Sequence, residues 1–228
     1  MCGRYTLFSD DADLVTLFDI DILEGEHEAA YNQAPSQWVR SVVGDETRIL
    51  TLQKWGFKPL WAKENFKPLI NARSETLVEK NIFRRAAMHR RCLLPSNGYY
   101  EWVTGEDGKK QPYFLSGPNT EGGPLPYSQS PVLAMAGIFD WSKTKDGDEV
   151  PTCAIVTRSA ADNLGHIHPR MPLFVPPSLY PDWLDPRLED PDQVDDLIRE
   201  IPLPHLAAQE VNRAVGNVRI DDPKVIFG

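Results

Sequence analysis

Short apolar segments separated by turn-forming residues restrict the fold of this chain more than any other feature. They recur about 8–15 residues apart, and several alternate apolar and polar residues with the period of two typical of half-buried strands. The spacing predicts strands at residues 3–8, 38–43, 47–55, 91–94, 98–103, 113–115, 132–140, 152–157 and 215–220.

Only short helices fit between these strands. Apolar periodicity and capping residues predict helices at residues 10–18, 72–78, 83–89 and 191–201, the first capped by Ser9 or Asp10. Residues 31–36 form a turn-rich segment, and residues 58–68 and 117–130 are predicted surface loops. No repeat or linker divides the chain. We therefore predict one α+β domain over residues 1–228, with a mostly antiparallel, barrel-like β core and short peripheral helices.

The cysteines and the apolar segments exclude several protein classes. No run of 18 apolar residues is present to span a membrane, and we expect no secretory signal. Cys2, Cys92 and Cys153 are widely spaced and lack CxxC or HExxH partners, so we predict no disulfide framework, no metal site and no cofactor. Unpaired cysteines indicate a reducing compartment, either the bacterial cytoplasm around the nucleoid or a nucleus. Nothing demands more than a monomer.

The charge is distributed unevenly along the chain. The net charge is −9, yet residues 31–110 hold 14 Lys and Arg against 8 Asp and Glu. Residues 1–30 hold 1 against 8, and residues 111–228 hold 9 against 17. A basic middle flanked by acidic segments is compatible with a nucleic-acid partner, and equally with ordinary solvated surface.

Cys2 follows the initiator Met1, which is removed when the second residue is small. Its removal leaves an aminothiol, in which the amine has an ordinary pKa of about 7.7–8.0 and the thiol one of about 8.5. Such an amine condenses with an aldehyde to a Schiff base, and the thiolate can close onto the imine carbon as a thiazolidine. Alternatively the thiol attacks an acyl group with the amine as base, or cysteine is merely tolerated at this position.

Polar residues near Cys2 and in the middle of the chain are further candidates. Arg4 shares the face of Cys2 if residues 3–8 form a strand. Asn71 and Arg73 lie on a turn entering a predicted helix, where such groups bind a phosphate or polarise a carbonyl. Asn71 and Ser74 are also good helix caps, which is the plain structural alternative.

Two later segments carry titratable groups. Glu101 stands between Tyr100 and Trp102 in an apolar strand, where poor solvation would suit it to act as an acid or base. The alternative is an edge carboxylate facing water. His168 and Arg170 alternate along an extended segment stiffened by prolines; a buried structural histidine is the other interpretation.

Eight ordered motifs together resemble the SOS response-associated peptidase (SRAP) family, whose members shield abasic sites in single-stranded DNA. They cover about 175 residues, and although each motif is weak alone, the ordered set is specific. The motifs are MCGRYTL at residues 1–7, YNQAPSQ at 31–37, WGFKPLWA at 55–62, INARSET at 70–76, FRRAAMHRRCLLPSNGYYEW at 83–102, GIFDW at 137–141, AIVTRSA at 154–160 and HPRMPLFV at 168–175.

The resemblance implies a role for each matching residue. Cys2 resembles the nucleophile that joins the abasic aldehyde as a thiazolidine, and Asn71 the residue that orients the adduct. Glu101 resembles the acid/base for Schiff-base formation and sugar-ring opening, and His168 the proton shuttle, including during reversal. The implied partner is single-stranded DNA with abasic sites, and no cofactor or metal is implied. The implied DNA-binding residues are Arg4, Pro35, Trp61, Arg73, Arg85, Thr157 and Arg170, with Pro35 and Trp61 as a wedge that bends the strand.

Two other functions remain open at this point. The first is an N-terminal-nucleophile amidotransferase or autopeptidase, since Met-Cys-Gly also opens glutamine amidotransferases; the family name itself records a peptidase. No second half supplying an amide pocket is evident. The second is a non-catalytic single-strand-binding module in which Cys2 is incidental.

Overall fold

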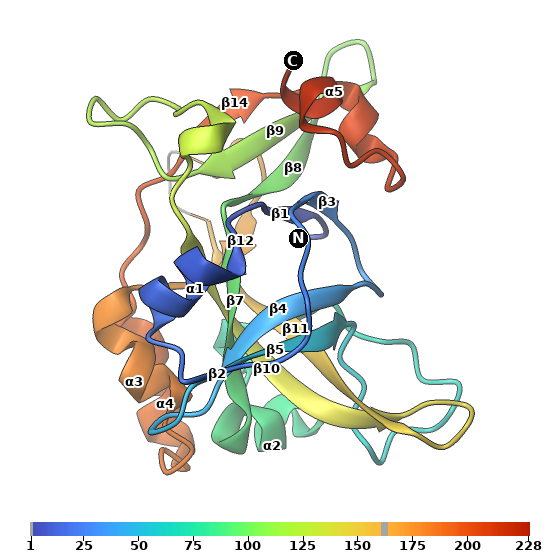
Figure 1. Cartoon of the computed structure of the whole chain (residues 1–228), viewed down its shortest axis with the longest axis vertical. Coiled ribbons are helices and arrows are strands. Elements are labelled where there is room, and N and C mark those ends of the chain that lie inside the picture. The colour runs from blue at the N-terminus through green and yellow to red at the C-terminus, as the bar shows by residue number, and fades with distance from the viewer. Residues whose placement is uncertain (1, 161–163) are drawn as a thin grey trace.

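A computed structural model describes residues 2–160 and 164–228, and five of its strands close on themselves (Figure 1). Their order is β11-β10-β7-β4-β5, and β5 pairs back to β11 through Lys54 opposite Thr152 and Trp55 opposite Cys153. These strands are β4 (Trp38–Val43), β5 (Ile49–Trp55), β7 (Arg91–Ser96), β10 (Leu133–Lys143) and β11 (Glu149–Ser159). The barrel-like, mostly antiparallel core is confirmed, and its closing pair is parallel.

Shorter strands extend this barrel. β6 pairs in parallel with β11, β12 pairs antiparallel with β11, β13 pairs with β10, and β2 pairs with β5. A second, five-stranded sheet has the order β14-β9-β8-β1-β3. The added strands are β1 (Tyr5–Leu7), β2 (Ile22–Leu23), β3 (Ala30–Gln33), β6 (Asn71–Arg73), β8 (Gly98–Thr104), β9 (Lys110–Ser116), β12 (Arg170–Pro172), β13 (Phe174–Val175) and β14 (Ala207–Glu210).

In the described part of the chain, five short helices lie at the periphery of the β core (Figure 1). The side chain of Asp10 caps the first by accepting a hydrogen bond from the Asp13 amide, as predicted. None of the helices in the described part of the chain has the length and apolar character to cross a membrane. The helices are α1 (Asp11–Phe18), α2 (Asn81–His89), α3 (Tyr180–Leu184), α4 (Pro191–Glu200) and α5 (Pro223–Phe227).

Three predictions of local structure were wrong. Residues 72–78 were expected to be helical, but Asn71–Arg73 is a strand and Ser74–Thr76 a single 3-10 turn. The reason is that an open edge of β11 is available to Asn71–Arg73. Ala30–Gln33 is also a strand, because it pairs with β1, and the turn is confined to the residues that follow it.

The predicted strand at 215–220 is instead a 3-10 turn, Arg213–Gly216, followed by irregular chain. The buried amide of Asn32 explains the difference. Its Nδ2 donates to the carbonyl oxygens of Val215, Asn217 and Ile220, which curls the chain around one side chain. Those carbonyls are therefore directed toward Asn32.

The first residue of β8 requires glycine. A Cβ built at Gly98 would lie 2.4 Å from the ring of Phe114 and 2.7 Å from the carbonyl oxygen of Leu115. We expect Gly98→Ala to lower the free energy of unfolding by about 1–3 kcal/mol, because the ring or the backbone must move. Urea denaturation measures this, with Gly216→Ala, whose added Cβ meets nothing within 4 Å, as the comparison for glycine loss without a clash. Equal values for Gly98→Ala and wild type would contradict the close packing.

Candidate active site

Cys2 is completely buried at the start of the chain described here. The side-chain amide of Asn71 donates a hydrogen bond of 2.9 Å to the Cys2 carbonyl oxygen. Asn71 is held there because β6 pairs in parallel with β11, with Asn71 opposite Ile155. Cys2 and Asn71, two residues of the predicted site, are thus joined by one direct contact.

The Cys2 thiol is held in its neutral form. Burial raises the pKa of Cys2 well above its ordinary value, and the negative charge of nearby Glu101 raises it further. Its sulfur lies 3.9 Å from the carbonyl oxygen of Arg4. A thiol in these surroundings is unreactive until its proton is taken or transferred in the reaction itself.

Glu101 is the buried acid of this group, with 5% of its surface exposed. Its strand, β8, pairs it with Tyr113 on β9. Burial raises the pKa of Glu101, and the proximity of His168 opposes that rise. The His168 Nδ1 atom lies 3.9 Å from Glu101 Oε1. A carboxyl with a raised pKa can donate a proton close to neutral pH.

The backbone fixes the ring of His168. Its Nδ1 lies 3.0 Å from the backbone nitrogen of Arg170, an N–H donor. The same Nδ1 is 3.0 Å from the Arg170 carbonyl oxygen. The backbone of Arg170 therefore presents a donor and an acceptor to the same ring nitrogen, and these two contacts hold the His168 ring in place.

Arg170 is engaged by protein groups. Its terminal nitrogens bind both oxygens of Glu75, and Nη2 also donates to the carbonyl and hydroxyl oxygens of Thr157. Thr157 is fully buried on β11, opposite Arg73 of β6. Arg73 is exposed.

Arg4 is likewise surrounded by protein groups. Its Nη1 donates to Asn32 Oδ1 at 2.6 Å and to the Val215 carbonyl oxygen at 2.8 Å, and its guanidinium lies over the ring of Trp102. Only 9% of Arg4 is exposed. Its contacts join the first strand to residues near the carboxyl end, and its role as a phosphate ligand stays a prediction.

The predicted wedge residues are presented on turns. Pro35 lies in a turn whose next residue, Ser36, has a left-handed φ of 75°, and the Ser36 amide donates to the Trp55 carbonyl oxygen. Trp61 is 62% exposed on the loop between β5 and β6. The Lys58 amide anchors that loop to the Thr152 hydroxyl. Both residues are thus held at the surface next to the closing pair of the barrel.

The structure therefore brings together Cys2, Asn71, Glu101, His168 and, through the last, Arg170. Arg85 is exposed on α2, and no contact among the described residues joins it to this group. Sequence reasoning missed Glu75 and Asn32, the partners of Arg170 and Arg4. Both lie inside quoted motifs, INARSET and YNQAPSQ, which is the signal that pointed to them.

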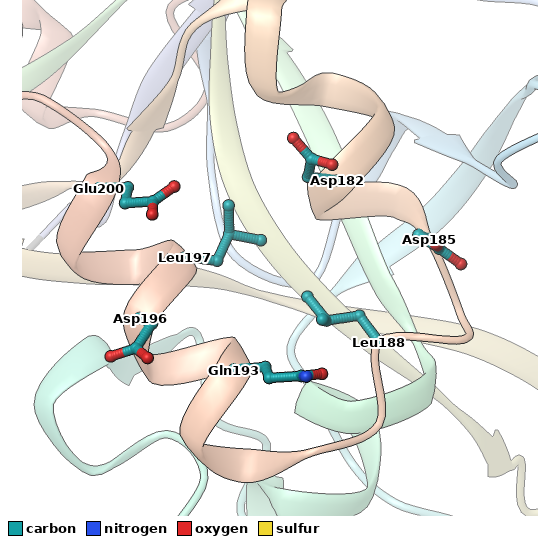
Figure 2. Close-up of a pocket in the computed structure, with 7 residues that line it drawn as sticks. All are labelled: Asp182, Asp185, Leu188, Gln193, Asp196, Leu197 and Glu200. Carbon is teal, nitrogen blue, oxygen red and sulfur yellow. The ribbon is translucent and has the colours of Figure 1, made fainter.

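A hollow of about 390 Å³ between α3 and α4 is a separate surface feature (Figure 2). Asp182, Asp185, Asp196 and Glu200 surround Leu188 and Leu197 there. The negative charges of these four carboxylates would repel the phosphates of a nucleic acid. In the described residues, no group of three or more His, Cys, Asp or Glu could hold a metal ion. We therefore place the candidate chemistry at Cys2.

Comparisons with known proteins agree with the motifs. The family model described as SOS response associated peptidase (SRAP) matches residues 1–218. "Abasic site processing protein YoqW" of Bacillus subtilis is 33% identical over 232 residues, covering 99% of both chains. "Abasic site processing protein HMCES" of Gallus gallus is 30% identical over 229 residues, covering 89% of this chain and 67% of that protein. A crystal structure of a Bacteroides thetaiotaomicron protein shares the fold, with a TM-score of 0.78, 22% identity and 98% coverage of each chain.

The raised pKa of Glu101 has a measurable consequence for stability. The protonated carboxyl is favoured in the folded state, so its stabilising contribution is complete below the ordinary value of 4.5 and is lost as pH rises through the raised pKa. Glutamine cannot ionise. The free energy of unfolding of Glu101→Gln, relative to wild type, should therefore increase across that window and then level off. Urea denaturation of both proteins from about pH 4 to about pH 8 checks this; a constant difference would mean that burial does not raise the pKa.

Proposed function

This chain belongs to the SOS response-associated peptidase family, and on that premise we propose that it recognises abasic sites in single-stranded DNA and joins them covalently to Cys2. The observation that carries the proposal is the burial of Cys2 against Asn71, beside a carboxyl and an imidazole. These are the groups that condensation with an aldehyde needs: an amine, an acid and a proton carrier.

The first requirement is a free α-amine. While Met1 precedes Cys2, the Cys2 nitrogen is an amide and cannot condense with an aldehyde. We therefore assign the peptidase of the family's description to removal of the residue ahead of Cys2. The mature protein would act as a monomer in the compartment that contains the chromosome, either the bacterial cytoplasm around the nucleoid or a nucleus.

The chemistry then proceeds in two balanced steps. The amine attacks the aldehyde carbon of the ring-opened sugar, and one water leaves as the imine forms; Glu101 donates the proton that the departing oxygen takes. The Cys2 S–H next adds across the C=N bond, with sulfur on carbon and the proton on nitrogen, and a five-membered thiazolidine results. The proton that the nitrogen gives up as the neutral imine forms returns to the Glu101 carboxylate through His168, which lies beside it.

Recognition of DNA must rest on phosphates and stacking, because an abasic site has no base edge to hydrogen-bond. Exposed Arg73 lies two residues after Asn71, and Lys54 is exposed at the barrel closure. Trp61 and Pro35 are proposed to stack on the neighbouring base. Stacking on one aromatic side chain contributes about 1–3 kcal/mol and tolerates any base.

Replacing Cys2 separates the amine from the thiol. Cys2→Ala still allows removal of Met1, so its amine should form only a Schiff base, which hydrolyses unless borohydride reduces it. Wild type should give a product stable to denaturing electrophoresis without reduction, and a tag that retains Met1 should abolish both. Intact-mass analysis reports the state of the N-terminus and the stoichiometry. An oligonucleotide without an abasic site is the control, and equal crosslinking to it would refute the proposal.

Replacing Trp61 tests the wedge. Trp61→Ala should weaken binding of an abasic strand by about 1–3 kcal/mol, while the crosslinking rate at saturating DNA stays unchanged. Trp141→Ala, on β10 with 40% of its side chain exposed, is the matched control. Fluorescence anisotropy measures the affinity; unchanged affinity in Trp61→Ala would exclude the wedge.

A further inference from the structure

The ion pair between Glu75 and Arg170 joins two segments that carry proposed catalytic groups. We propose that Glu75 is a positioning residue, which holds Arg170 and through it His168 in place opposite Asn71. The role rests on the function proposed above, because it concerns the same site. Glu75 lies within the INARSET motif but was assigned no role from the sequence. We expect its loss to slow proton transfer and to leave DNA affinity unchanged.

The geometry of the pair is that of a forked contact. Arg170 Nη1 binds Glu75 Oε1 at 2.5 Å, and Nη2 binds Oε2 at 2.9 Å. Two parallel hydrogen bonds fix the planes of both groups, which a single contact between point charges would not do. The contact spans 95 residues of sequence, so it is formed only by the tertiary fold.

Each partner lies next to a residue of the active site. Glu75 is on the 3-10 turn that follows β6, four residues after Asn71. Arg170 begins β12, and its backbone amide hydrogen-bonds to His168 Nδ1. Freeing the Arg170 side chain would therefore release the segment whose backbone holds the ring of His168.

Thr157 is the fixed point between the two segments. β11 pairs there with β6 on one side, through Arg73, and with β12 on the other, through Pro172. Arg170 Nη2 also donates to the Thr157 carbonyl and hydroxyl oxygens. Glu75, Arg170 and Thr157 together form a clamp across β11. It lies next to β6, which carries Asn71, and next to the start of β12, which His168 precedes by two residues.

The engaged state of Arg170 argues against a dominant role as a phosphate ligand. Its side chain is 13% exposed, both terminal nitrogens have acceptors, and Nε is buried without a partner among the described residues. Partial burial works to raise the pKa of Glu75, yet hydrogen bonds from Arg170 hold it below its ordinary value. The carboxylate therefore stays charged at neutral pH and neutralises Arg170.

The experiment compares Glu75→Gln with Glu79→Gln. Glu79 is an exposed carboxylate four residues along the chain, so the two variants lose the same charge from the same region. In single-turnover crosslinking at saturating abasic DNA, Glu75→Gln should be slower by about 10-fold or more, because small displacements of catalytic groups are costly. Glu79→Gln should keep the wild-type rate. Affinity for an intact single strand should be equal in the two variants.

Two measurements separate positioning from other roles. Arg170→Lys keeps the charge but loses the fork, so adding Glu75→Gln to it should slow the reaction little further. Nitrogen-15 NMR without DNA should give the same His168 ring signals in wild type and in Glu79→Gln, and displaced or broadened ring signals in Glu75→Gln, because the ring has lost its fixed position.

Equal rates and equal His168 spectra for Glu75→Gln and Glu79→Gln would overturn the positioning role. Weaker binding of intact DNA by Glu75→Gln at an unchanged rate would overturn it too, in favour of Arg170 as a phosphate ligand prepared by Glu75. Because the NMR measurement uses no DNA, it still decides the matter if wild type fails to crosslink, which would refute the proposed function alone.

Discussion

The pairing of β11 with strands on both of its sides is the constraint on which the rest of this structure depends. On one side it pairs antiparallel with β10 and β12, and on the other in parallel with β5 and β6. The β5 pairing closes the barrel, and the β6 pairing brings Asn71 to Cys2. Parallel pairing between distant segments is needed because the loop between β5 and β6 returns the chain to the same edge of β11. The fold and the candidate site thus share one strand.

Burial disfavours the charged forms of both Cys2 and Glu101, and this has a different consequence for each group. Water is excluded from both, which raises the pKa of each group, and the negative charge of Glu101 raises the pKa of Cys2 further. A neutral thiol is protected from oxidation and from unrelated electrophiles. A neutral carboxyl is ready to donate a proton. In the proposed mechanism, the surroundings that make the thiol inert alone leave it ready to add once an aldehyde has entered and formed an imine.

Much of this arrangement is readable in the sequence, for identifiable reasons. Alternation of period two predicted most strands of the barrel, because half-buried strands must alternate. Cys2 was predicted from chemistry, since only an N-terminal cysteine offers an amine with its thiol. Residues 72–78 were predicted to be a helix because Asn71 and Ser74 are good helix caps, but the same residues also occur next to strands, and Asn71–Arg73 forms a strand. The partners of Arg4 and Arg170 were missed, because Asn32 and Glu75 approach them only through contacts between segments distant in sequence.

Neutralisation of the buried arginines bears on how DNA would be retained. Arg4 and Arg170 were expected to hold phosphates, yet amide, carbonyl and carboxylate groups of the protein already receive their N–H groups. Arg4 and Arg170 would therefore have few N–H groups left to bind phosphates. Most of the phosphate contacts would then be made by exposed residues such as Arg73 and Lys54. Contacts of that kind weaken steeply as salt rises. The proposed covalent bond to Cys2 would not, and through it a protein with an acidic total charge would remain on a DNA strand that electrostatics alone would release.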